Sequence, residues 1–164
     1  MSARVILAVM NVAVWIISLS VVAAGLFAGL MMTLIIVMDR MWRTLEPAEF
    51  AVEFPRFLAA AKGHPIIAGT TFLSFLGPAG GGIALLSVEP VVGVICLAAA
   101  LVFFVGAFLV TILFSFPLYE AAQAWTAGAP ADMTVRSRFL RLNAVRFGSS
   151  ASAFAMLVLA VRML

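Results

Sequence analysis

The sequence predicts an all-α protein: an integral membrane four-helix bundle with a short amphipathic helix in the first loop. Residues 91–119 contain no charged side chain, and neither do residues 5–38. At about 1.5 Å per residue, a helix over either run can cross the roughly 30 Å hydrocarbon layer of a bilayer. The composition agrees, because 65% of the 164 residues are hydrophobic and only 10% are charged. We expect a single transmembrane domain over residues 1–164, with spans at about 8–38, 65–88, 91–117 and 142–162.

The first apolar run predicts an uncleaved span. A secretory signal is the competing interpretation, but its apolar core would be far shorter and a mature soluble domain would follow. Gly25 and Gly29 lie four residues apart, next to Ala24 and Ala28. Such small residues let another helix approach closely in a membrane. Glycine pairs also arise by chance in apolar helices, so packing and accident both remain open.

Residues 39–64 form the longest charged segment and predict the amphipathic helix. Phe50, Phe54 and Phe57 recur at helical spacing, whereas Glu49 and Glu53 fall elsewhere on the helix. Proline at position 55 predicts a kink or a break in this helix. The helix either shields the end of the bundle or lies as a lid over a cavity between the spans.

The second span begins at Pro65, since proline is well tolerated in the first turn of a helix. Its second half contains the glycine-rich run 77–82, Gly-Pro-Ala-Gly-Gly-Gly. Proline removes a backbone donor and glycine weakens a helix, so this run predicts an interruption. Either a cavity or a plain kink near the membrane edge would accommodate it.

The third span is expected to end near Pro117, and a polar, turn-rich loop is expected from Tyr119 onward. Asp132 or Thr134 can cap the next helix, which runs into the fourth span. On that span, Gly148 and Ser152 predict a small-residue packing face.

The distribution of cations predicts the orientation. Cationic loops stay on the cytoplasmic side of a membrane, which places the first and third loops in the cytoplasm and both termini on the non-cytoplasmic side. The abundance of arginine is typical of a bacterial source and hence of the inner (cytoplasmic) membrane. The first and third loops carry Arg40, Arg43, Arg56, Lys62, Arg136, Arg138, Arg141 and Arg146, whereas the opposite side carries only Arg4 and Arg162.

Few residues can carry chemistry. His64 is the only histidine and Cys96 the only cysteine, so no metal site is expected. Polar groups at membrane depth are costly and often mark a site. The catalytic residue is unknown, with Asn143, Arg146 and His64 as candidates. Ligand or lipid contacts are expected from Arg138, Arg141, Tyr119 and Trp125.

Several short motifs resemble the DUF1772 family, whose members are often named anthrone oxygenase-like. The motifs are Gly-Leu-Phe-Ala-Gly at 25–29, Pro117, Trp125, and an arginine-rich helix ending Asn-x-x-Arg at Asn143 and Arg146. The resemblance implies a four-helix membrane protein with relatives that oxidise polycyclic anthrones with molecular oxygen, without an evident metal or flavin. We therefore expect no cofactor. The family tends to carry asparagines around the proline, where this chain has Ser115 and Tyr119, and a tryptophan where Phe139 stands.

Two hypotheses about function follow. The first is a membrane protein that binds an apolar ligand (a polycyclic aromatic, lipid or quinone) between its helices, with or without an oxygenase-like activity. The second is a non-catalytic accessory subunit of a larger membrane complex, or a protein that associates with further copies of itself. A channel or transporter ranks third, because no acid–base pair lies within the spans. No basic groove interleaved with aromatic residues indicates a nucleic-acid partner.

Overall fold

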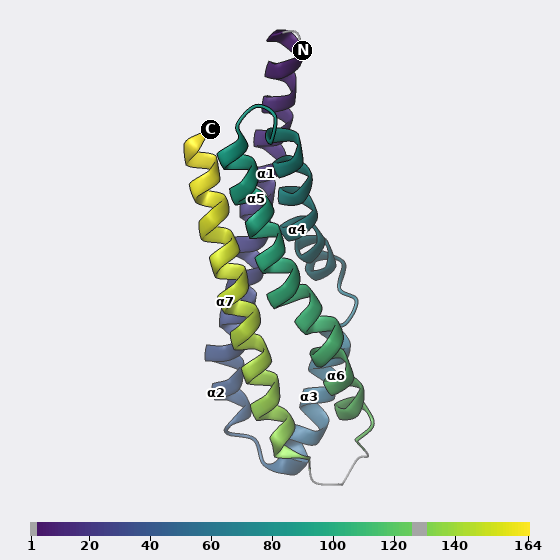
Figure 1. The fold of residues 1–164 in the computed structure, drawn as a ribbon. Coiled ribbons are helices and arrows are strands. Elements are labelled where there is room, and N and C mark those ends of the chain that lie inside the picture. Colours follow the sequence, from purple (N-terminus) through teal and green to yellow (C-terminus); the bar gives the residue numbers. More distant parts are fainter. Residues whose placement is uncertain (1–2, 126–130) are drawn as a thin grey trace.

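The protein is an all-α bundle of four antiparallel helical units (Figure 1). The computed structural model describes residues 3–125 and 131–164, and no strand occurs among them. Four helices are long and apolar enough to cross a membrane, which confirms the predicted multi-pass bundle. In chain order the elements are α1 (Ala3–Thr33), η1 (Leu34–Met38), α2 (Asp39–Trp42), α3 (Pro47–Ala61), α4 (Pro65–Leu85), α5 (Pro90–Phe103), η2 (Phe104–Leu109), η3 (Thr111–Ser115), α6 (Phe116–Gln123) and α7 (Met133–Met163), where η marks a π-helical turn.

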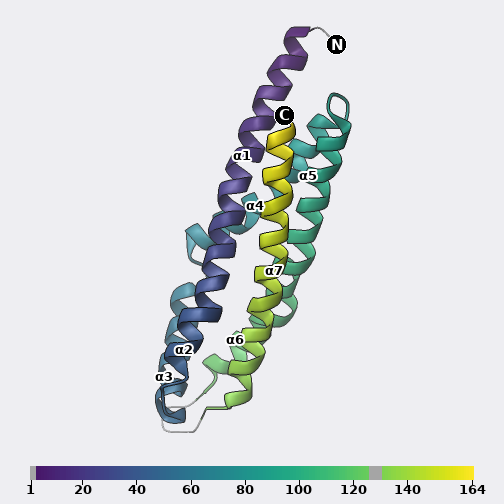
Figure 2. The same cartoon turned by 90° about the vertical axis from the view of Figure 1, so that its left-hand side faces the viewer.

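The helices pack in a ring, and the termini share one end of it. α1 packs on α4 and α7, and α5 packs on the same two helices. Figure 2 shows α1 and α7 running side by side, with the N- and C-termini at the same end. An even number of crossings requires this placement.

The outer surface is apolar, as lipid requires. Trp15 is 72% exposed and Leu26 is 61% exposed, whereas Ala24 on the opposite, inward face of the same helix is fully buried. Soluble proteins rarely expose apolar patches of this extent. The bundle therefore contacts the lipid bilayer directly.

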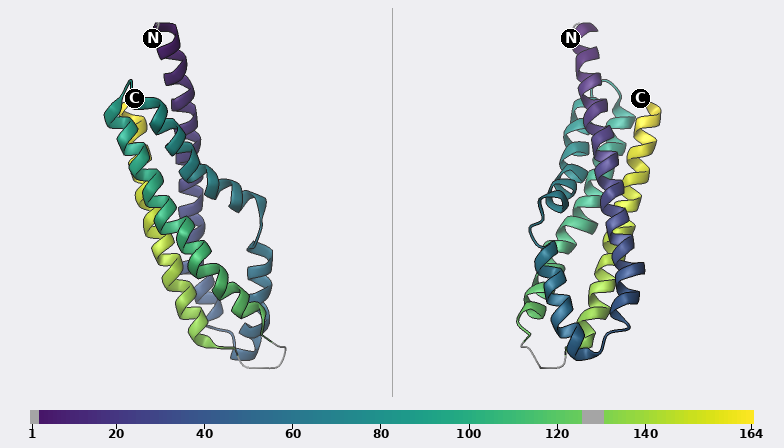
Figure 3. Two further views of the ribbon diagram at one scale, coloured as in Figure 1. Left: turned by 45° about the vertical axis from the view of Figure 1, so that its right-hand side comes forward. Right: turned by 180° about the vertical axis from the view of Figure 1, so that it is seen from behind.

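The second helical unit consists of two helices joined by a short link, α3 and then α4, and the part of α4 next to the link bends away from the bundle (Figure 3). Glu46 and Glu49 form a capping box at the start of α3, with Pro47 in its first turn. Phe50 and Phe54 bury completely on the bundle side. The predicted amphipathic helix is present and shields the end of the bundle, but Pro55 does not break it.

The glycine-rich run does not interrupt α4, which continues through Pro78 to Leu85. The run therefore does not break the helix, and the bend of α4 in Figure 3 agrees with the plain kink that was the alternative. The glycines also serve close packing. A Cβ added at Gly82 would lie 2.9 Å from the backbone oxygen of Gly93 on α5, and one at Gly81 would lie 2.9 Å from Ile17 on α1. The run brings the backbones of α4, α5 and α1 together, and Gly80 and Gly81 also line an apolar groove between α1 and α4.

The third helical unit continues past Pro117 to Gln123, so the loop expected from Tyr119 onward begins later than predicted. Two π-helical turns, η2 and η3, come directly before the proline, and α6 extends to Gln123. A π turn widens the helix and changes the hydrogen-bond register, which accommodates a residue that lacks an N–H. Tyr119 therefore lies on a helix and not in the predicted loop.

The fourth unit, α7, is one helix of 31 residues. Asp132 caps it by accepting a hydrogen bond from the Thr134 backbone N–H at 2.9 Å. Hydrogen bonding to Thr134 lowers the pKa of the exposed Asp132 carboxyl, so the cap remains charged at neutral pH.

The end of the bundle opposite the termini combines ion pairs with an aromatic cluster. Asp39 is buried and binds Arg43 at 2.7 Å and Arg136 of α7 at 3.1 Å. Trp42 packs at the centre of the rings of Phe50, Phe54, Phe57 and Phe139. These contacts hold α2, α3 and α7 together and form the floor beneath the site described next.

Candidate functional site

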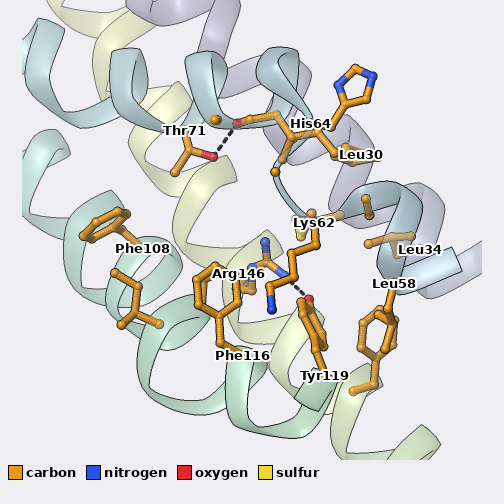
Figure 4. Close-up of a pocket in the computed structure, with 18 of the residues that line it drawn as sticks. Leu30, Leu34, Leu58, Lys62, His64, Thr71, Phe108, Phe116, Tyr119 and Arg146 are labelled. Atoms are coloured by element: carbon orange, nitrogen blue, oxygen red, sulfur yellow. Dashed lines mark hydrogen bonds between the residues drawn. The ribbon is translucent and has the colours of Figure 1, made fainter. Parts of the chain in front are cut away.

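An apolar cavity of about 300 Å³ lies beside the link where α3 ends and α4 begins. This volume falls at the lower end of the range of small-molecule sites. Most of its wall is aliphatic or aromatic, and Figure 4 shows Phe108 and Phe116 on one side with Leu34 and Leu58 on the other. The lining residues are Leu30, Met31, Leu34, Phe57, Leu58, Ala61, Lys62, Gly63, His64, Ile67, Ala68, Thr71, Phe72, Phe108, Thr111, Ile112, Phe116, Tyr119, Phe139 and Arg146.

The cavity exists because the second helical unit is discontinuous. Residues 62–64 link α3 to α4, and Gly63 adopts a φ of 77°. Only glycine takes up this backbone conformation readily, so the chain can turn sharply between the two helices. The link forms part of the cavity wall and is exposed on its other side.

A buried polar cluster lies at one wall of the cavity. Arg146 of α7 is only 5% exposed, and its Nη1 donates to Asn143 Oδ1 at 2.9 Å and to the Tyr119 hydroxyl at 3.4 Å. Its Cζ lies 5.4 Å from the centroid of the Phe27 ring, a cation–π contact. Figure 4 shows the guanidinium and the Tyr119 hydroxyl near the centre of the site.

The hydrogen-bonding capacity of this cluster is incomplete. Arg146 Nε and Asn143 Nδ2 are buried and have no partner among the described residues. The same part of the chain contains no carboxylate paired with Arg146. A buried charge without a counter-ion is costly, so this arrangement is suited to a ligand that supplies hydrogen-bond acceptors.

Two hydroxyls also lie on the wall, in addition to Lys62 and His64 near the link. Thr71 Oγ1 donates to the backbone oxygen of Ile67 at 2.6 Å, and Thr111 Oγ1 donates to that of Ala107 at 2.7 Å. Both hydroxyls already donate to their own helices, so they can only accept further hydrogen bonds.

The structure brings together three of the residues singled out in the sequence and separates the others. Asn143, Arg146 and Tyr119 form the buried cluster, with Asn143 behind the cavity wall. His64 is exposed and precedes the first residue of α4, and its ring points away from Arg146 in Figure 4. It can contact a ligand only at the opening.

Three further predicted contact residues do not line the cavity. Trp125 is half-buried and packs on Phe50 and Phe54 in the aromatic cluster. Arg138 and Arg141 are exposed and line a separate surface groove between α6 and α7. Their position suits lipid phosphate at the membrane surface.

Of the four residues predicted to pack helices together, one lies at a helix contact and three are exposed. A Cβ at Gly25 would lie 3.1 Å from the Phe154 ring, so Gly25 does pack against α7. Gly29, Gly148 and Ser152 are exposed, and the two glycines have no neighbour within 4 Å of an added Cβ. The buried face of α7 lies instead at Ser150, Ala153 and Leu157.

Sequence reasoning missed most of the cavity wall. Phe72 and Phe108, which are 5.8 Å apart between ring centroids, come from α4 and η2. The only signal in the sequence is the phenylalanine spacing 72/75 and 104/108, which also fits a lipid-facing or core position. Thr71 and Thr111 carried no signal.

No family model, curated protein or solved structure matches the chain. The fold and site define the class of protein: a four-helix, multi-pass membrane protein with an apolar cavity, whose wall carries a buried arginine without a carboxylate partner among the described residues. Within the described residues, no group of three His, Cys, Asp or Glu side chains could hold a metal ion.

Proposed function

We propose that this protein binds an apolar small molecule with a hydrogen-bond-accepting head between its membrane helices. A polycyclic aromatic compound, a quinone or a lipid has this character. The body of the ligand would occupy the apolar cavity, and its oxygen would lie at Arg146 and Tyr119. The single observation that carries the proposal is Arg146, which is 5% exposed, has no carboxylate partner among the described residues and lines an otherwise apolar space.

A direct test fills the cavity and leaves the polar cluster intact. The Thr111→Trp variant places an indole in the cavity, whereas Val105→Trp adds the same group on the lipid-facing surface, where Val105 is 50% exposed. A ligand that binds only the folded state raises the thermal unfolding midpoint. We expect 9-anthracenemethanol to raise the midpoint of the wild type and of Val105→Trp in a saturable manner, and to have no effect on Thr111→Trp. Equal shifts in all three proteins would indicate partition into lipid or detergent and would contradict the proposal.

We further propose that the protein oxidises its ligand, as the likeness to anthrone oxygenases suggests. The reaction would convert the methylene of an anthrone into a carbonyl, with one oxygen atom of O₂ retained and the other released as water with the two methylene hydrogens. Oxygen uptake by purified protein with anthrone, lost in Asn143→Ala, would support it. Inert protein that still binds the ring probe would leave binding as the function.

A non-catalytic accessory subunit is the second candidate. Gly29, Gly148 and Ser152 are small residues on outward faces of α1 and α7, where another membrane helix could approach closely. Extraction in a gentle detergent followed by mass measurement tests this candidate. A stable complex or a dimer supports it, and a lone monomer with a bound small molecule argues against it.

A further inference from the structure

We infer that the ligand of this cavity is an anion: a carboxylate or phenolate oxygen carried on an apolar body. This inference rests on the proposed function and narrows it to one class of ligand. It follows from the charges that line the cavity, from the missing counter-ion of Arg146 and from the donors that remain available.

The cavity wall carries cations and no anions. The cationic side chains of Lys62 and Arg146 line it, and no aspartate or glutamate is among its lining residues. Asp39, which is buried, is engaged by Arg43 and Arg136 and does not line the cavity. The electrostatic potential inside the cavity therefore favours a negative charge.

Arg146 retains its charge at this depth, because a guanidinium is not deprotonated in proteins. The Asn143 and Tyr119 oxygens and the Phe27 ring face stabilise that charge only through dipoles and a quadrupole. In a wall of low polarity an opposite full charge stabilises the guanidinium far more than a dipole does. A ligand oxyanion supplies this charge, whereas a neutral carbonyl group does not.

The available donors fit an oxyanion. Arg146 Nη1 is already used by Asn143 and Tyr119, while Nη2 makes no hydrogen bond within the described residues. The Tyr119 hydroxyl accepts from Nη1, so its own proton remains available. Nη2 and the phenol O–H are therefore both available to donate to an oxyanion. Hydrogen bonds of this charge-assisted kind are stronger than neutral ones.

The roles of the three residues differ accordingly. Arg146 and Tyr119 line the cavity and would contact the ligand, whereas Asn143 does not line it. Asn143 holds the guanidinium through Oδ1 at 2.9 Å and is a positioning residue.

A matched pair of probes separates charge from shape. Anthracene-9-carboxylate and 9-anthracenemethanol share one ring system and differ in the charge of the head group. We expect the wild-type protein in nanodiscs of neutral lipid at pH 7.5 to bind the carboxylate at least about tenfold more tightly than the alcohol, a difference of about 1.4 kcal/mol. Arg146→Gln should abolish this preference and still bind the alcohol. Arg162→Gln, which removes an arginine that does not line the cavity, should behave as the wild type.

The nature of the apolar body is tested with a second pair. Dodecanoate and dodecanol carry the same two head groups on an acyl chain, so competition against the anthracene probes distinguishes an aromatic from a lipid-like ligand. A preference for the carboxylate in either pair that disappears in Arg146→Gln supports the inference.

The outcomes that contradict this inference differ from those that contradict the proposed function. Equal affinity of the wild type for carboxylate and alcohol would overturn the anionic ligand and leave the apolar site standing. A carboxylate preference that persists in Arg146→Gln would overturn the assignment of the anion to Arg146, because another cation of the wall, such as Lys62, would then bind it. No saturable binding of any of the four probes would overturn the proposed function itself. If Arg146→Gln fails to fold, Tyr119→Phe, which removes one donor and leaves the charge unchanged, should weaken binding of the carboxylate several-fold and binding of the alcohol less, because charge-assisted hydrogen bonds are the stronger ones.

Discussion

At the scale of single residues, the guanidinium of Arg146 has hydrogen bonds but no counter-ion among the described residues. Asn143 and Arg146 lie one turn apart on α7, and Asn143 Oδ1 accepts from Nη1 at 2.9 Å. An amide oxygen orients the guanidinium and leaves its charge uncompensated. A carboxylate at the same position would orient the guanidinium and also compensate its charge.

This comparison gives a prediction for Asn143→Asp. The new carboxylate should form an ion pair with Arg146, because an opposite charge within about 4 Å keeps a carboxyl ionised. We expect the unliganded protein to become more resistant to heat and to lose its affinity for anthracene-9-carboxylate at least about tenfold. Thermal unfolding with and without the probe measures both effects.

The matched control is Asn143→Leu, which removes the amide and adds no charge. It should lower thermal stability, because the guanidinium loses a hydrogen-bond partner. If Asn143→Asp also lowered stability and retained the carboxylate, Arg146 would already have a counter-charge and the site would not select anions.

At the scale of helices, the glycine run of α4 determines how closely the helices approach. A Cβ at Gly82 would lie 2.9 Å from a backbone oxygen of α5, which cannot move aside as a flexible side chain could. Gly80 is two residues away in the same run and has no neighbour within 4 Å of an added Cβ. The two positions therefore form a matched pair.

We expect Gly82→Ala to destabilise the protein by about 1–3 kcal/mol, as overpacking usually does. Gly80→Ala should be neutral or slightly stabilising, because alanine favours a helix over glycine by about 1 kcal/mol. Unfolding in mixed micelles with increasing denaturing detergent compares the two. Equal losses of stability would mean that the close approach of α4 and α5 at Gly82 is not important to the bundle.

The helices also show what the sequence could and could not predict. Runs without charge identified the four spans, and short-range rules identified the start of α4 at Pro65 and the cap at Asp132. Short-range rules did not predict that the helices continue past Pro117 and through the glycine run, because the π turns before one and the neighbouring backbones around the other depend on packing. Local propensity does not contain that information.

The residues of the candidate site could be predicted from the sequence, but their arrangement could not. Asn143 and Arg146 were recognisable because polar side chains at membrane depth are costly and often mark a site. Tyr119 was recognisable because it ends an apolar run. Their convergence on one cavity was not predictable, since it requires α6 to continue past Pro117 and α3 to separate from α4 at Gly63.

At the scale of the whole molecule, four spans place both termini on one side. The cations gather at the opposite end, where Arg43 and Arg136 pair with Asp39. The positive-inside rule therefore predicts that this end faces the cytoplasm.

Single cysteines in a Cys96→Ala background test this orientation. Thr44→Cys lies in the loop between α2 and α3, and Ser87→Cys lies in the turn between α4 and α5 at the other end. A membrane-impermeant maleimide added to intact bacterial cells whose outer membrane has been permeabilised should label Ser87→Cys only. Inverted inner-membrane vesicles should show the reverse, and labelling of both positions from one side would contradict four crossings.

The most direct measurement is an experimental structure of the protein with 10-bromoanthracene-9-carboxylate, located by the anomalous scattering of bromine. The account predicts one bromine position inside the cavity between α1, α4 and η3, with the carboxylate against Arg146 and Tyr119. Bromine found only outside it, for example in the surface groove at Arg138 and Arg141, or a ring inside the cavity with its carboxylate turned away from Arg146, would contradict the account.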